Sequence, residues 1–166
     1  MSLQRDFCNT LEEALQLRRA LGDEATLGHS LDNLALIATS LGDYATSRRL
    51  GEEALTVRRK IGDKQGLAIT LGNQAFAALE QGDYETAERY YSESLTLSQE
   101  IEDKRGIGYC LLGMAGLAAR SRGAWLEAVR LAEDGRQTLA ELGIEMEREE
   151  QRMYDEVMEG AKRVIE

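Results

Sequence analysis

Apolar residues recur at spacings of three and four along nearly the whole chain, as in amphipathic helices that bury one face. Short Gly-Asp pairs separate these stretches. Glycine can end a helix in the left-handed conformation, and aspartate can cap the first amides of the next helix. The pattern therefore predicts an all-α protein, with helices at 3–21, 24–41, 44–61, 64–81, 84–101, 104–121, 124–142 and 145–164.

The pattern repeats at an offset of 40 residues. Equivalent apolar positions stay in register: Leu31, Leu71 and Leu111; Ala35, Ala75 and Ala115; Ala38, Ala78 and Ala118; Leu15, Leu55 and Leu95. The turn motif Gly82-Asp83-Tyr84 returns one residue late as Gly123-Ala124-Trp125, so the third unit carries one inserted residue in its helix or turn. One helix pair cannot bury its apolar face alone. The stability of the fold must therefore come from the stacking of neighbouring helix pairs.

We therefore expect a single domain over 1–166, built as a curved α-α superhelix. Helix 3–21 is equivalent to the second helix of a repeat and has no first helix to pair with. It is followed by repeat 1 (24–61), repeat 2 (64–101), repeat 3 (104–142) and a C-terminal capping helix (145–164). In the capping helix, the predicted apolar face comprises Met153, Tyr154, Val157, Met158, Ala161 and Val164. The residues of this helix that are predicted to be exposed to solvent are Glu147, Glu149, Glu150, Arg152 and Glu156.

The second repeat resembles the tetratricopeptide repeat through Leu71-Gly72-x2-Ala75-x2-Ala78-x3-Gly82-x-Tyr84-x2-Ala87-x3-Tyr91-x2-Ser94. The resemblance covers about residues 7–143. The chain has no proline where that family has one, and its period exceeds the usual ~34 residues by about six. The longer form is similar to repeats in bacterial regulator and signalling proteins, kinesin light chains and Pins/LGN-type scaffolds. The resemblance implies that the concave face binds a protein or peptide, and it implies no chemistry.

Asn33 and Asn73 occupy equivalent positions beside the apolar stripe. An asparagine at this place commonly grips a peptide backbone in the family that the chain resembles, and its amide can both donate and accept. Alternatively, each asparagine is simply solvated or caps a helix. The third repeat has Gly113 at the equivalent position, which weakens the prediction of a peptide-binding row. The same inner face is expected to present His29, Asp32, Leu36, Ser40, Phe76, Glu80, Tyr109, Gly116 and Arg120.

Phe76 and Tyr109 are the best anchor candidates, because buried aromatic side chains dominate many binding energies. Each could instead pack between repeats, and for Tyr109 we favour that alternative. The arginine pairs, which include Arg58-Arg59, are expected on a solvated face with helical ion pairs.

The formal net charge of −10 disfavours direct nucleic-acid binding, and the longest uncharged run is too short to span a bilayer. A single histidine supplies no histidine-pair metal motif, and no catalytic constellation is visible. We expect no enzyme activity, no cofactor and no metal. Cys8 and Cys110 are expected to be reduced, in a cytoplasmic protein.

The leading hypothesis is a protein–protein interaction module, acting in a regulatory or signalling system. The alternative is structural: a homodimer formed through the C-terminal helix or the open N-terminal helix. Helix 3–21 lacks the first helix of its own repeat. We therefore expect either that the chain is part of a longer protein or that a second chain covers the face left open. Its residues Leu3, Phe7, Leu11, Ala14 and Leu15 could supply a symmetric contact.

Overall fold

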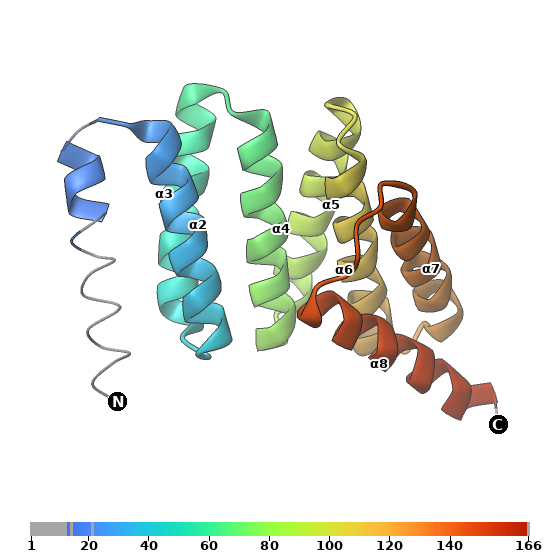
Figure 1. Ribbon diagram of the computed structural model, residues 1–166. Helices are drawn as coiled ribbons and strands as arrows, with labels where there is room; N and C mark the ends of the chain where they lie inside the picture. The colour runs from blue at the N-terminus through green and yellow to red at the C-terminus, as the bar shows by residue number, and fades with distance from the viewer. Residues whose placement is uncertain (1–12, 14, 21, 166) are drawn as a thin grey trace.

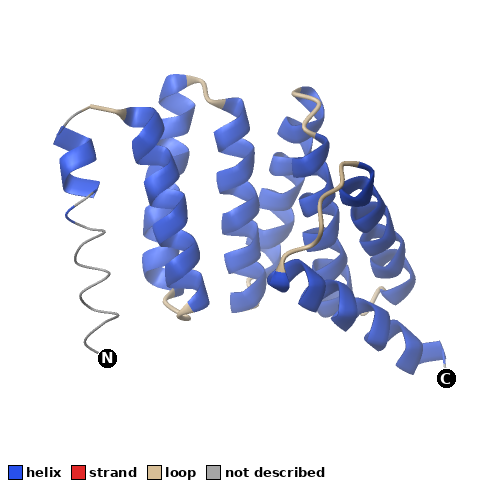
Figure 2. Cartoon of the chain, in the orientation of Figure 1, coloured by secondary structure: helices blue, strands red, loops and turns tan. Residues whose placement is uncertain are grey.

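The computed structural model describes residue 13, residues 15–20 and residues 22–165. Every regular element in this part of the chain is an α-helix, as predicted (Figure 2). The helices are α2 (Glu24–Ser40), α3 (Tyr44–Ile61), α4 (Lys64–Gln81), α5 (Tyr84–Glu100), α6 (Lys104–Arg122), α7 (Trp125–Glu141) and α8 (Arg148–Ile165). Residues 15–20 are also helical, and most of the predicted helix 3–21 lies outside the described residues.

The boundaries of α2 to α7 agree with the prediction to within one residue. The inserted residue of the third unit lies in α6, which ends at Arg122 where a strict repeat would end near 121. The predicted start of the last helix at 145 is wrong, because α8 begins at Arg148. Gly143 has a φ of 70°, and no capping side chain stands directly before Glu145, so residues 144–147 form a non-helical link.

The turn between α3 and α4 shows how each Gly-Asp pair works. Gly62 takes a φ of 70°, and the Asp63 carboxylate accepts a hydrogen bond from the Gly66 amide at 2.8 Å. Equivalent aspartates cap four further helices: Asp23, Asp43, Asp83 and Asp103. The sixth position in the series is Ala124 before α7, which has a similar backbone conformation but no side-chain cap.

The helices pack as successive antiparallel pairs, α2–α3, α4–α5 and α6–α7 (Figure 1). The second helix of each pair also packs on the first helix of the next pair. The first helices contact one another, α2 with α4 and α4 with α6, whereas α3 and α5, both fully described, do not. The stack therefore has α2, α4 and α6 on its inner side.

Small residues make the close packing possible. The alanine ladders are buried, as predicted, at 35, 75 and 115 and again at 38, 78 and 118. Leu111 is only half-buried, and its neighbour Leu112 enters the core in its place. The Cys110 thiol is buried, as predicted, and hydrogen-bonds with the Ser94 hydroxyl; burial raises its pKa. Cys8 lies outside the described residues.

Glycines on facing helices receive large side chains, and the direction of this fit changes along the stack. Between the first two repeats, Gln74 of α4 fills the space beside Gly51 of α3. Between the second and third repeats the arrangement is reversed, because Tyr91 of α5 fills the space beside Gly113 of α6. Each interface between repeats therefore has its own shape, although the backbone repeats at 40 residues.

α8 closes the C-terminal end of the stack and runs obliquely across the lower end of α6 (Figure 1). Met153, Val157 and Ala161 are buried, as predicted. Val164 was also expected on the buried face but is 64% exposed. Glu150 was expected to be exposed to solvent but is half-buried. One of its carboxylate oxygens has no hydrogen-bond partner among the described residues, and burial raises the pKa of this carboxyl.

Candidate binding surface

The inner side of the stack carries a row of accessible side chains on α2 and α4. Their spacing of i, i+4 and i+7 places them on one face of each helix, and the 40-residue offset makes the two helices equivalent. The row consists of His29, Asn33 and Leu36 on α2 and of Ile69, Asn73 and Phe76 on α4. We call these six residues the inner strip.

Leu36 and Ile69 are exposed, at 40% and 44% of their full surface. Phe76 is half-buried and packs at the edge of a core cluster that contains Ala75 and Met153. Ile69 was not among the predicted site residues. Its signal was present in the sequence, because it stands 40 residues after His29 and 40 before Tyr109. A comparison of equivalent inner positions, repeat by repeat, would have found it.

Asn33 is exposed and Asn73 is half-buried. Three other polar side chains on these helices, Ser30, Ser40 and Thr70, each donate a hydrogen bond to a backbone carbonyl of their own helix. The amides of Asn33 and Asn73, in contrast, have no hydrogen-bond partner among the described residues. They are therefore free to bond to another molecule.

Asp32 was predicted to be accessible on the inner face, and this prediction is wrong. It is only 5% exposed and accepts hydrogen bonds from Arg58 at 2.5 Å and from the Thr70 hydroxyl at 2.8 Å. Burial raises the pKa of Asp32, and the bonds from Arg58 and Thr70 oppose that rise. Asp32 thus belongs to the interface between the first two repeats and is not available to a ligand.

Arg58 was predicted on the solvated face and is instead 1% exposed. Besides Asp32, it donates to the helix cap Asp63 at 2.5 Å, and its side chain occupies the space next to Gly28 and Gly66. Its guanidinium also comes within 3.5 Å of Nδ1 of His29. The guanidinium therefore joins α2, α3 and the start of α4 directly beneath one end of the inner strip.

On the third repeat, α8 covers most of the predicted inner-face positions. The Arg120 guanidinium donates to Glu80 at 2.7 Å and to Glu156 of α8 at 2.6 Å, and Arg152 of α8 pairs with Glu80 at 3.0 Å. Burial opposes ionisation of Glu80, but the bonds from Arg120 and Arg152 hold its pKa below the ordinary value. Glu80 and Arg120 thus already have partners within the chain.

Gly116 was also predicted to face a ligand, but it is buried because the Met153 side chain of α8 lies against it. The inner position of Gly113 is filled by Tyr91. Of the predicted inner-face residues on α6, Tyr109 and Arg120 are half-buried, but Arg120 is paired with Glu80 and Glu156. The Arg105 guanidinium lies 5.4 Å from the centre of the Tyr109 ring. Apart from Tyr109, the predicted inner-face residues that stay accessible and unpaired among the described residues lie on α2 and α4.

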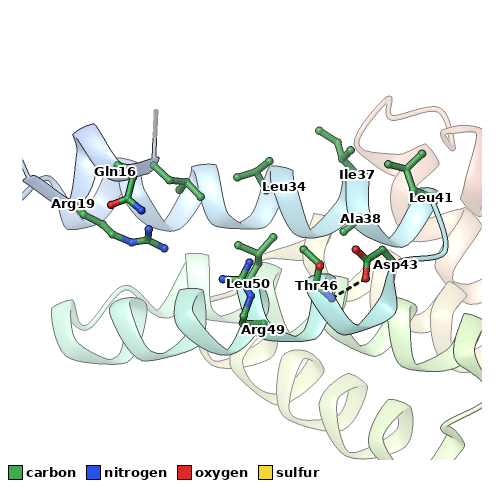
Figure 3. A pocket seen from close by; sticks show the side chains of 11 residues that line it. Gln16, Arg19, Leu34, Ile37, Ala38, Leu41, Asp43, Thr46, Arg49 and Leu50 are labelled. Carbon is green, nitrogen blue, oxygen red and sulfur yellow. Dashed lines mark hydrogen bonds between the residues drawn. The ribbon is translucent and has the colours of Figure 1, made fainter. Parts of the chain in front are cut away.

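A separate pocket lies at the N-terminal end of the stack, with a volume of about 230 Å³ (Figure 3). Its apolar lining includes Leu34 and Ile37 of α2, the C-cap residue Leu41 and Leu50 of α3. Two of its polar side chains already serve the fold: Asp43 caps α3, and Arg19 pairs with Glu53 at 2.7 Å.

Leu15 was predicted to contribute to a contact between two copies of the chain. It is instead 2% exposed and packs on α2 and α3 of its own chain. The other predicted contact residues, Leu3, Phe7, Leu11 and Ala14, lie outside the described residues. Over the described residues, no three acidic, cysteine or histidine side chains come together as a metal site. None of the helices described is both long and apolar enough to cross a membrane.

Comparison with known proteins agrees with the repeat geometry. Residues 27–61 and residues 66–141 each match a family model described as tetratricopeptide repeat, and together these ranges cover more than half of the chain. No curated protein matches the chain in sequence.

Proposed function

The chain belongs to the tetratricopeptide repeat family, whose members generally mediate protein–protein interactions, and we propose that it binds a segment of a partner protein along the inner strip. The observation that carries the proposal is the combination, on one face, of two equivalent asparagines and two exposed apolar side chains, Leu36 and Ile69. The two asparagine amides have no hydrogen-bond partner among the residues that the structure describes. Such a face offers hydrogen bonds to a peptide backbone and apolar contacts to its side chains.

Proteins of this family are typically non-enzymatic scaffolds, and we propose the same for this chain, within a regulatory or signalling system. The inner strip has no nucleophile paired with a base. The proposed location is cytoplasmic, where thiols stay reduced.

The test is affinity capture from the native lysate, with the wild-type chain compared with the double variant Asn33→Ala and Asn73→Ala. Both asparagines are accessible, so circular dichroism and thermal melting should stay nearly unchanged while partner capture falls. A matched control is Arg48→Ala with Arg59→Ala, which changes two exposed side chains on the outer helix α3 and should leave capture intact. Undiminished capture by the asparagine variant would remove the inner strip as the binding site.

Self-association through the C-terminal helix is a second proposal. Val164, which the helical pattern places with the buried residues of α8, is 64% exposed. A second copy of the chain could cover it. Light scattering over a range of concentrations would test this, with Val164→Asp as the variant; a chain that stays monomeric at every concentration would exclude it.

A further inference from the structure

The inner strip carries no carboxylate, ammonium or guanidinium group, in a protein of which 30% of residues are charged. Its one ionisable side chain is the imidazole of His29, which counts as neutral in the formal charge at pH 7. From Ala25 to Ser40 on α2, the one charged residue is Asp32, which is buried against Arg58. From Gln65 to Gln81 on α4, the one charged residue is Glu80, which pairs with Arg120 and Arg152. The charges of this part of the stack lie instead on the outer helices, where α3 alone has Arg48, Arg49, Glu52, Glu53, Arg59 and Lys60 exposed or half-buried.

We infer that the inner strip selects an uncharged, apolar-containing segment of its partner, bound in extended form. This inference rests on the proposed function and specifies the ligand class. A charged side chain buried against Leu36, Ile69 and Phe76 would lose its hydration and find no counter-charge on the strip. An apolar side chain in the same place would gain by leaving water.

The asparagine amides favour an extended backbone. Within the described part of the chain, the donors and acceptors of Asn33 and Asn73 are unused, and an extended segment presents free N–H and C=O groups to them. A helix uses those groups internally, except at its ends. The two amides lie on neighbouring inner helices, so one segment that crosses both helices can bond to each in turn.

The length of the bound segment follows from the boundary at α6. Tyr91 fills the space at Gly113, Met153 fills the space at Gly116, and Arg120 is paired with Glu156. Two helices remain, and because packed helices lie ~8–10 Å apart, the strip is roughly 20 Å wide. At about 3.3 Å per residue, an extended segment of roughly six residues would cross it.

The test uses a random octapeptide library displayed on phage and selected on the full chain, with parallel selection on the Asn33→Ala/Asn73→Ala variant. We expect peptides enriched only on the wild type to contain at least two apolar residues and few Asp, Glu, Lys or Arg. Synthetic copies of these peptides should bind with a Kd that changes less than about twofold between 50 and 500 mM salt, because no ion pair is screened.

A charge introduced into the strip sharpens the test. Ile69→Lys changes an exposed side chain and should weaken the selected peptides at least tenfold, whereas Leu126→Lys, at a residue that is 88% exposed on α7, should not. If the selected peptides are charged, weaken strongly with salt and still require the asparagines, the inference fails and the proposed function stands. If no peptide depends on the asparagines, both fail.

Discussion

The ring of Tyr91 occupies the space that a side chain at position 113 would need: a Cβ on Gly113 would lie 2.3 Å from both Cε1 and Cζ of the ring. This contact explains why the ladder of Asn33 and Asn73 ends at the third repeat. Any residue with a side chain at position 113 would displace the ring of Tyr91, which is 3% exposed in the core.

Restoring the ladder with Gly113→Asn should therefore destabilise the protein, by about 2–3 kcal/mol, because overpacking outweighs the better helix propensity. Gly72→Ala is the matched control, since the nearest atom to its new Cβ is the Ser94 hydroxyl oxygen at 3.5 Å. It should be neutral or stabilising by up to ~1 kcal/mol. Urea denaturation measures both, and equal stability of the two variants would refute the packing explanation.

Arg58 and Arg59 are neighbours in sequence with opposite environments, and their substitutions should differ accordingly. Arg58→Met leaves the buried carboxylate of Asp32 without its partner and should cost about 3–5 kcal/mol. Arg59→Met removes an exposed pair with Glu93 and should cost less than about 1 kcal/mol. A double-mutant cycle with Asp32→Leu would measure the coupling, and additive effects would contradict the buried ion pair.

Glu150 should make the stability of α8 depend on pH. Burial raises its pKa, so the folded state holds the proton more tightly than the unfolded chain does. Its favourable contribution is therefore complete below the ordinary carboxyl pKa and is lost as the pH rises through the raised value. Glu150→Gln should raise the melting temperature at pH 7 and have little effect near pH 4.

The gain from Glu150→Gln should stay below about 1 kcal/mol, because solvent still screens this half-exposed group. Glu149→Gln, at the exposed neighbouring position, is the control and should change little at either pH. If Glu150→Gln stabilised the protein more at pH 4 than at pH 7, the pKa of Glu150 would be lowered in the folded state and not raised.

Ala124 offers a stabilising substitution, because it occupies an N-cap position without a side-chain cap. Ala124→Ser would complete a Ser-x-x-Glu capping box with Glu127 and should stabilise the chain by about 1 kcal/mol. Ala140→Ser, at an exposed position inside the same helix, should instead cost a few tenths of a kcal/mol, roughly the difference in helix propensity. Thermal melting of both variants separates capping from a general effect of serine.

Docking of α8 can be followed through Trp125, the one tryptophan of the chain, because its ring packs against Gly160 of α8. Met153→Asp places a charge in the contact between α8, Gly116 and Leu79. We expect a red-shifted tryptophan emission and loss of helical signal limited to α8. Gln151→Asp, at an exposed position of α8, should leave the emission unchanged. An unshifted emission for Met153→Asp would show that the helix stays docked without this contact.

The helices, their caps and their pairing could be predicted because they depend on local signals. Asp63 caps α4 through a bond that spans three residues, and the apolar spacing of each helix needs no knowledge of its neighbours. The 40-residue register then placed Asn33 and Asn73 on equivalent faces. The availability of these faces could not be predicted, because it depends on which side chain fills each space between repeats.

An all-helical repeat stack thus follows from the order of the residues alone, since capping and periodicity act within a few residues along the chain. Which inner positions are free depends on contacts between helices that lie far apart along the chain. Arg58 reaches Asp32 across 26 residues, and Arg120 reaches Glu80 across 40 and Glu156 across 36. These pairings depend on side-chain volumes and on the oblique path of α8, and no periodic pattern encodes either.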